Sequence, residues 1–286
     1  MPKWERQYTA IDPMDELLRC TCGKPDCPTG NLRPLREHMG ALIQAILSCG
    51  HVGLIDGGQD PWPGTLYSLH MAVSIEDVFV DPAYIDESSS GLYCDSAWEF
   101  DEEQRETSSK YVAALAIFNF IWMAYEEAIG YCLGENFSKD KPAVQSRKFL
   151  NGTEEKHETK IASFNAVYRA TARICGKRSG LKDGIDLIQT KYRLEGASAA
   201  AELMRLFRNH VVHGDDSTPL SGGSTTVAHF YASATLLLML IQILILHRVT
   251  NQSAKIPLSL VLDDKGELSA GFVLLNLHRP EDRWLT

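Results

Sequence analysis

Hydrophobic residues recur at three- and four-residue spacing along much of the chain, which is the period of a helix with one or more buried faces. Pro34 suits a first helical turn, and Gly214 suits a left-handed helix end. The pattern therefore predicts a mainly α-helical bundle. The predicted helices are residues 32–49, 109–130, 154–175, 195–213 and 225–250, with a shorter helix or turn at 185–192.

The most apolar stretch, residues 225–250, contains an uncharged run from Phe230 to Leu246. A membrane-spanning helix needs about 20 predominantly apolar residues. The uncharged run is shorter than that and holds Ser233, Thr235 and Gln242. The pattern favours the central helix of a bundle, and a membrane-associated sensor built on this stretch is the alternative.

Three stretches carry the signals of strands and turns. Residues 66–73 and 77–81 are short apolar runs that follow glycine- and proline-rich segments, which predicts strands. Residues 257–277 predict a β-hairpin about a turn at residues 263–266. The expected fold class is mainly α, a helical bundle with a smaller α/β N-terminal extension and a C-terminal β-hairpin. A loop at residues 86–91 suggests two domains, residues 1–100 and 101–286.

Charge is distributed unevenly along the 286 residues. The formal net charge is −9, but residues 139–208 hold 15 Lys and Arg against 8 Asp and Glu, a net charge of +7. A basic segment is what contact with an RNA backbone requires, whereas lysines and arginines on exposed helix faces are the alternative explanation. No apolar leader is evident at the start, and seven cysteines without one favour reduced thiols in the cytoplasm.

Three cysteines near the start, Cys20, Cys22 and Cys27, are spaced like the ligands of a zinc knuckle. A tetrahedral site needs a fourth ligand, and the candidates are His38, Cys49 and His51. A structural zinc ion would hold together a segment that has little core of its own. The alternative is three thiols in a turn-rich loop.

The helix at residues 195–213 ends in the segment Arg208-Asn209-His210-Val211-Val212-His213-Gly214. Asn209 and His213 are four positions apart and share a helix face, whereas Arg208 and His213 are about 140° apart around an ideal helix. Arg208 and His213 would therefore converge only if the helix end unwinds or if a second copy contributes one of them. His210 is either a neighbouring group of the site or a packed side chain.

The helix at residues 109–130 is apolar on most sides yet contains Glu126 and Glu127. A carboxylate inside such a helix needs a partner, because an unpaired buried charge is costly. Arg208 is the expected partner, and Glu126 is favoured over Glu127. A solvent-exposed glutamate pair is the alternative.

Arg208, Asn209 and His213 resemble the signature of the HEPN superfamily, an Arg followed by a polar residue and by a His four to six positions on. The resemblance extends over residues 108–250, and the segment Trp-Met-Ala-Tyr-Glu-Glu that ends at Glu127 is similar to the first HEPN helix. It implies a helical bundle and a metal-independent endoribonuclease with Arg208, Asn209, His213 and Glu126 at a homodimer interface. It also implies RNA as the substrate, a role as a toxin or in antiphage defence, and an antitoxin or regulatory partner.

The chemistry of RNA is consistent with these residues. The 2′-hydroxyl is the nucleophile, so cleavage needs a base, an acid and a positively charged group that stabilises the negatively charged transition state. It needs no cofactor. Histidine transfers protons at neutral pH, and arginine binds phosphate oxygens bidentately. One histidine does not easily serve as both acid and base, which favours a two-fold dimer. The alternative from another class is a non-catalytic HEPN module that binds a nucleotide or a partner protein.

Overall fold

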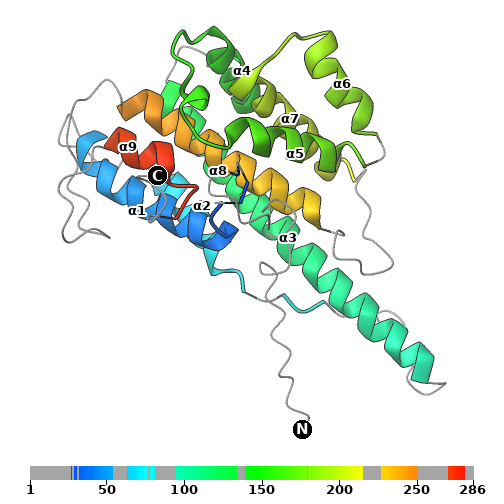
Figure 1. Ribbon diagram of the computed structural model, residues 1–286. Coiled ribbons are helices and arrows are strands. Elements are labelled where there is room, and N and C mark those ends of the chain that lie inside the picture. The colour runs from blue at the N-terminus through cyan, green and yellow to red at the C-terminus, as the bar shows by residue number, and fades with distance from the viewer. Residues whose placement is uncertain are drawn as a thin grey trace.

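The computed structural model describes residues 27, 29–30, 32–53, 63–76, 78–80, 95–133, 139–178, 180–214, 227–249 and 270–280. Within these ranges the regular structure is helical, which confirms the predicted mainly α fold (Figure 1). The helices are α1 (Leu35–Gly53), α2 (Pro63–Ser74), α3 (Asp95–Leu133), α4 (Pro142–Gly152), η5 (His157–Thr159), α5 (Phe164–Cys175), α6 (Lys182–Thr190), α7 (Gly196–Val212), α8 (Ala228–Val249) and α9 (Ala270–Asn276).

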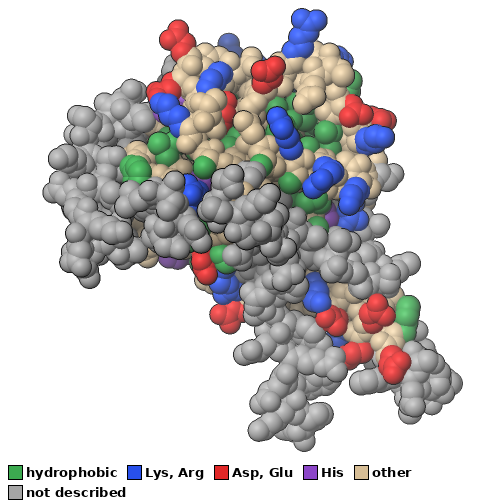
Figure 2. Space-filling model, in the orientation of Figure 1, with side chains coloured by type: hydrophobic (Ala, Val, Ile, Leu, Met, Phe, Trp, Pro, Cys, Tyr) green, Lys and Arg blue, Asp and Glu red, His purple; other side chains and the backbone are tan. Residues whose placement is uncertain are grey.

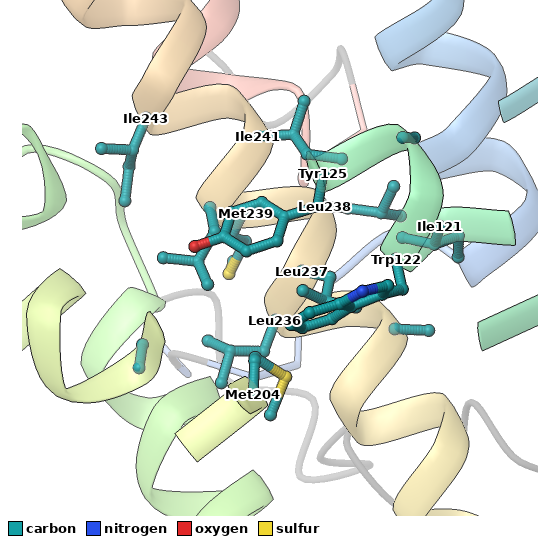
Figure 3. Close-up of a cluster of buried hydrophobic side chains, with 14 of the residues drawn as sticks. Ile121, Trp122, Tyr125, Met204, Leu236, Leu237, Leu238, Met239, Ile241 and Ile243 are labelled. Carbon is teal, nitrogen blue, oxygen red and sulfur yellow. The ribbon is translucent and has the colours of Figure 1, made fainter. Parts of the chain in front are cut away.

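Helix α8 is the centre of the bundle. Helices α1, α3, α5, α7 and α9 all pack against it, and its side chains from Ala228 to Leu246 are buried. Figure 3 shows Leu236, Leu237 and Leu238 of α8 among Trp122 and Tyr125 of α3 and Met204 of α7. The helix is apolar all round because it is enclosed on all sides. The expected central helix at residues 225–250 is therefore confirmed for the part that the structure describes.

Two helical segments, Glu99–Leu133 of α3 and Ala228–His247 of α8, are long and apolar enough to cross a membrane. Length and composition alone do not separate such a helix from the core helix of a soluble protein. Here the most apolar stretch of the α8 segment is wholly buried inside the bundle, and that of the α3 segment is about half buried.

The polar side chain of Gln242 in α8 links three helices. It accepts a hydrogen bond from His38 Nε2 of α1 at 2.6 Å, and its own amide nitrogen donates to the carbonyl of Leu274 in α9 at 2.8 Å. Buried polar groups need such partners, since an unpaired one costs about 1–3 kcal/mol. Gln242, a polar residue in a mostly apolar helix, therefore fixes α1 and α9 on α8.

Two of the predicted strand regions are wrong. Residues 66–73 belong to α2, where Leu66, Leu69 and Ala72 repeat at three-residue spacing and face α3. Part of the second arm of the predicted C-terminal hairpin forms α9, whose Val273 and Leu274 are buried. Residues 257–269, the first arm and turn of that hairpin, lie outside the described residues, and the described part of residues 77–81 makes no strand.

Helix α3 has 39 residues and is longer than predicted, because it begins at Asp95 and includes the acidic run that precedes residue 108. Its N-terminal half extends beyond the rest of the bundle (Figure 1). The expected boundary near residue 100 falls within this helix, and the division into two domains stays a prediction. The predicted helix at residues 154–175 is shorter than expected, since α5 begins only at Phe164 after the single turn η5.

Two buried histidines predict acid sensitivity of the fold. Burial lowers the pKa of His38 to about 4 and that of His278 to about 3, because the charged imidazolium loses its hydration in the core. The unfolded chain protonates both rings below a pH of about 6.5, so stability that is present above that pH is lost as the pH falls towards 4. We expect the free energy of unfolding to be about 4 kcal/mol lower at pH 5 than at pH 7, about 2 kcal/mol from each ring.

Urea denaturation at the two pH values measures this difference. His278→Leu is expected to remove about half of it. His70→Leu is the matched control, because His70 is exposed on α2. If the pH dependence of stability were unchanged in the His278→Leu protein, it could not be assigned to the burial of His278.

Candidate functional site

The motif helix α7 is held at its start by a carboxylate from another part of the chain. Glu158 of η5 accepts a hydrogen bond from the backbone nitrogen of Ala197 at 3.2 Å. The first amide groups of a helix lack internal partners, and a negative charge near them is favourable. Gly196 has a φ of +53° and lies directly against the Glu158 side chain, so this close approach requires a residue without a Cβ.

The end of α7 has the predicted cap. The backbone nitrogen of His213 donates to the carbonyl of Asn209 at 2.9 Å, and that of Gly214 donates to the carbonyl of Val211 at 3.1 Å. Gly214 has a φ of +75°, the left-handed conformation expected for a glycine after a helix. His213 is exposed and Asn209 is half-buried. Both residues therefore lie at the accessible end of the helix.

Arg208 lies on a different side of α7 from His213. Its guanidinium carbon is 5.9 Å from the centre of the Trp122 ring of α3, a cation–π contact. It makes no hydrogen bond or ion pair with any residue that the structure describes. Because the backbone stays helical through Val212 and His213 keeps an α-helical conformation, the end does not unwind. One chain alone thus leaves Arg208 and His213 about 140° apart, and about 7.5 Å apart along the axis.

The expected pair between Glu126 and Arg208 is not formed. Glu126 is half-buried in α3 and has no hydrogen bond or ion pair within the described ranges, while Glu127 is exposed beside Gly64 of α2. The prediction failed because it was made from the helix pattern alone. Which side chains meet across two helices depends on where the helices cross.

A different carboxylate, Glu202 on α7 itself, pairs with two arginines. It is fully buried and accepts from Arg147 Nη1 of α4 at 2.9 Å. It also accepts from Arg205 Nη2 at 2.6 Å and Nε at 3.0 Å. The hydrogen bonds with Glu202 raise the pKa of Arg205. Sequence reasoning missed this group, and the signal was a lone glutamate within an alanine-rich helix that is buried on several sides.

A second set of polar side chains, His210, Arg178 and His229, lies close to the motif helix. His210 is buried with its ring against Gly180, and Arg178 Nη2 contacts the ring of His229 of α8 at 2.8 Å. His229 also packs against Phe207 of α7, with ring centres 5.7 Å apart. His210 is therefore turned into the bundle, so it is a packed side chain and not a second exposed group beside His213. Neither Arg178 nor His229 was predicted.

Two of the three cysteines of the predicted zinc knuckle, Cys20 and Cys22, lie outside the described residues. Cys27 is half-buried in a turn where its carbonyl accepts from the backbone nitrogen of Gly30 at 3.2 Å. His38, one candidate for the fourth ligand, is buried in the bundle and bonded to Gln242. Within the described ranges no three metal-binding side chains cluster, and zinc binding stays a prediction.

The part of the chain around the motif helix is rich in charged side chains. Figure 2 shows Lys and Arg side chains, with Asp and Glu side chains among them, over the upper part of the molecule, where Figure 1 places α4, α5, α6 and α7. This is the part formed by the segment with a net charge of +7.

Comparisons with models of protein families, with curated proteins and with solved structures found no match to this chain.

Proposed function

We propose that this protein is a metal-independent endoribonuclease of HEPN type that acts as a homodimer in the cytoplasm. The observation that carries the proposal is the end of α7. There the exposed side chain of His213 shares one face of the helix with Asn209, and Arg208 immediately precedes Asn209. The helical bundle around α7 and the basic segment that leads into it support the proposal. A role as a toxin or in antiphage defence, with an antitoxin or regulatory partner, belongs to the same proposal.

The reaction follows from the chemistry of these side chains. A base removes the proton of the 2′-hydroxyl, O2′ attacks the phosphorus, and the bond from phosphorus to O5′ breaks as O5′ receives a proton. The products are a 2′,3′-cyclic phosphate and a 5′-hydroxyl. In each site His213 removes the proton of the 2′-hydroxyl as the base, and a water molecule supplies the proton to O5′. Arg208 stabilises the charge on the phosphoryl oxygens, and Asn209 orients the histidine or the phosphate.

The position of Arg208 indicates how a dimer would complete the site. Since Arg208 and His213 lie on different sides of one α7, a single phosphate contacts both only when two copies of the helix meet. A two-fold axis repeats each residue across the interface. Arg208 of one chain then faces His213 of its partner, and the two sites of the dimer are equivalent.

Mixing two inactive variants tests this arrangement. In a mixed dimer of Arg208→Ala and His213→Ala chains, one site has lost both residues and the other retains both. We expect an equal mixture to recover about a quarter of the wild-type rate, because half of the dimers are mixed and each has one intact site. The measurement is cleavage of a labelled RNA with chelator present, after the two chains have been unfolded and refolded together.

Native mass spectrometry of the refolded sample is the check that mixed dimers have formed. No recovery in a sample that contains them would contradict a site shared in this way. Wild-type products are examined in parallel for 5′-hydroxyl ends, and 5′-phosphate ends would contradict the proposed reaction.

The second candidate is a non-catalytic HEPN module that binds a nucleotide or a partner protein. It is favoured by the separation of Arg208 and His213 in one chain and by the absence of a Glu126 contact to Arg208 among the described residues. Binding of RNA without cleavage by the wild-type dimer would support this candidate over the nuclease.

A further inference from the structure

Four side chains form a basic and aromatic cluster on the surface beside the motif helix. Tyr192, in the segment before α7, has Arg147 of α4 6.0 Å from its ring centre and Lys191 5.7 Å from it. Arg205 of α7 joins them through Glu202, which binds both arginines. We call Arg147, Lys191, Tyr192 and Arg205 the Tyr192 cluster. The motif did not require any of these residues.

Glu202 fixes the two guanidinium groups and leaves part of each available. The carboxylate is fully buried, whereas the side chains of Arg147 and Arg205 are 23% and 27% exposed. Arg147 donates to Glu202 through Nη1 alone, and Arg205 through Nε and Nη2. In the described part of the chain their remaining N–H groups have no acceptor. An arginine held in this way loses less rotamer freedom when it binds a ligand.

The charge and shape of the Tyr192 cluster indicate an anionic ligand that contains planar aromatic rings. Two arginines bind one buried carboxylate, Lys191 adds a third cation beside the Tyr192 ring, and Tyr192 is 43% exposed. Proteins that bind single-stranded nucleic acid combine aromatic side chains, on which bases stack, with cations that contact the phosphates. Bases also stack on the plane of a guanidinium group. A duplex offers its bases only at their edges, so a stacking surface favours a single strand.

One member of the Tyr192 cluster, Arg205, lies on the same helix as the motif. Arg205 precedes Arg208 by one helical turn, and His213 is eight residues beyond Arg205, about 12 Å along the axis. We propose that the Tyr192 cluster is a subsite for single-stranded RNA, which binds a nucleotide neighbouring the one at the motif. This inference rests on the proposed function for the identity of the ligand, and it adds that the substrate is unpaired RNA.

The test measures binding separately from cleavage. A short fluorescein-labelled RNA without secondary structure is titrated with the His213→Ala protein, and its anisotropy is recorded. Adding Tyr192→Ala is expected to weaken binding about tenfold, within the range for loss of one stacked base. Tyr192→Phe keeps the ring and is expected to bind as the parent does. Tyr67→Ala is the matched control, because Tyr67 is exposed on α2 and belongs neither to the motif helix nor to the Tyr192 cluster.

A second measurement reports the phosphate contacts. Lys191→Gln removes an exposed charge that is not part of the Glu202 ion pairs, so the fold is retained. We expect this change to lower the slope of log affinity against log salt concentration by about 0.7, the value for one phosphate contact to a single strand. An unchanged slope would contradict a phosphate contact at Lys191.

Failure of the subsite and failure of the nuclease have different signatures. Equal affinities of the Tyr192→Ala and parent proteins would overturn the subsite whether or not RNA is cut. An equal loss of affinity for a perfect RNA duplex would overturn the preference for a single strand. A tenfold loss in a protein whose wild type cuts no RNA would support the subsite and remove only the nuclease.

Discussion

Replacing His213 by alanine is expected to lower the rate of RNA cleavage by about 10²–10⁴-fold, the usual contribution of a general acid or base. The side chain is exposed beyond the last turn of α7, and the backbone bond from His213 to Asn209 does not depend on it. The fold and its stability should therefore be retained. Initial rates on a labelled RNA with excess enzyme measure the effect, and circular dichroism verifies the fold.

His70→Ala is the matched control for this prediction. His70 is also an exposed histidine, but it belongs to α2 and not to the motif helix. Wild-type rates are expected for His70→Ala. If His213→Ala cut RNA as fast as the wild type, with the same product ends, the catalytic site would lie elsewhere.

Replacing Glu202 by glutamine is expected to lower the free energy of unfolding by about 2–4 kcal/mol. Breaking a buried ion pair by removing one partner is costly, because the remaining charge is left without compensation. Here two guanidinium groups lose their common carboxylate, although both can turn partly towards water. Urea denaturation monitored by tryptophan fluorescence measures the change.

Two further variants identify the origin of that loss. Glu154→Gln is the matched control, because Glu154 is exposed and is expected to alter stability by less than about 0.5 kcal/mol. Adding Arg205→Gln to Glu202→Gln should cost less than the sum of the two single changes, since they remove the same contact. Additive losses would show that Glu202 acts through something other than Arg205.

Most long helices were predictable because burial leaves a periodic trace over many residues. The stretches that became α1, α3, α7 and α8 each contain enough turns for the period to be clear. The short runs that became α2 and α9 do not. A run such as Phe272 to Leu275 suits a buried strand as well as a helix, and packing against α8 decided the outcome.

The site was predictable where it depended on one helix and unpredictable where it depended on two. The cap at Gly214 and the angle between Arg208 and His213 follow from positions along α7 alone. The partner of a buried carboxylate depends instead on where two helices cross. An example is the ion pair between Glu202 of α7 and Arg147 of α4. Glu126 was predicted from its apolar helix, but it is half-buried and makes no hydrogen bond or ion pair with Arg208.

The complete enclosure of α8 has a consequence for hydrogen exchange. An amide proton at the centre of α8 reaches solvent only when the surrounding helices separate, and that separation amounts to global unfolding. The slowest deuterium uptake of the chain should therefore occur between Phe230 and Leu246. The last turn of α7 ends in exposed residues, so its amides open by local fraying on a much shorter timescale. The chain thus combines a slow-exchanging centre with a fast-opening end at His213, where a substrate would bind.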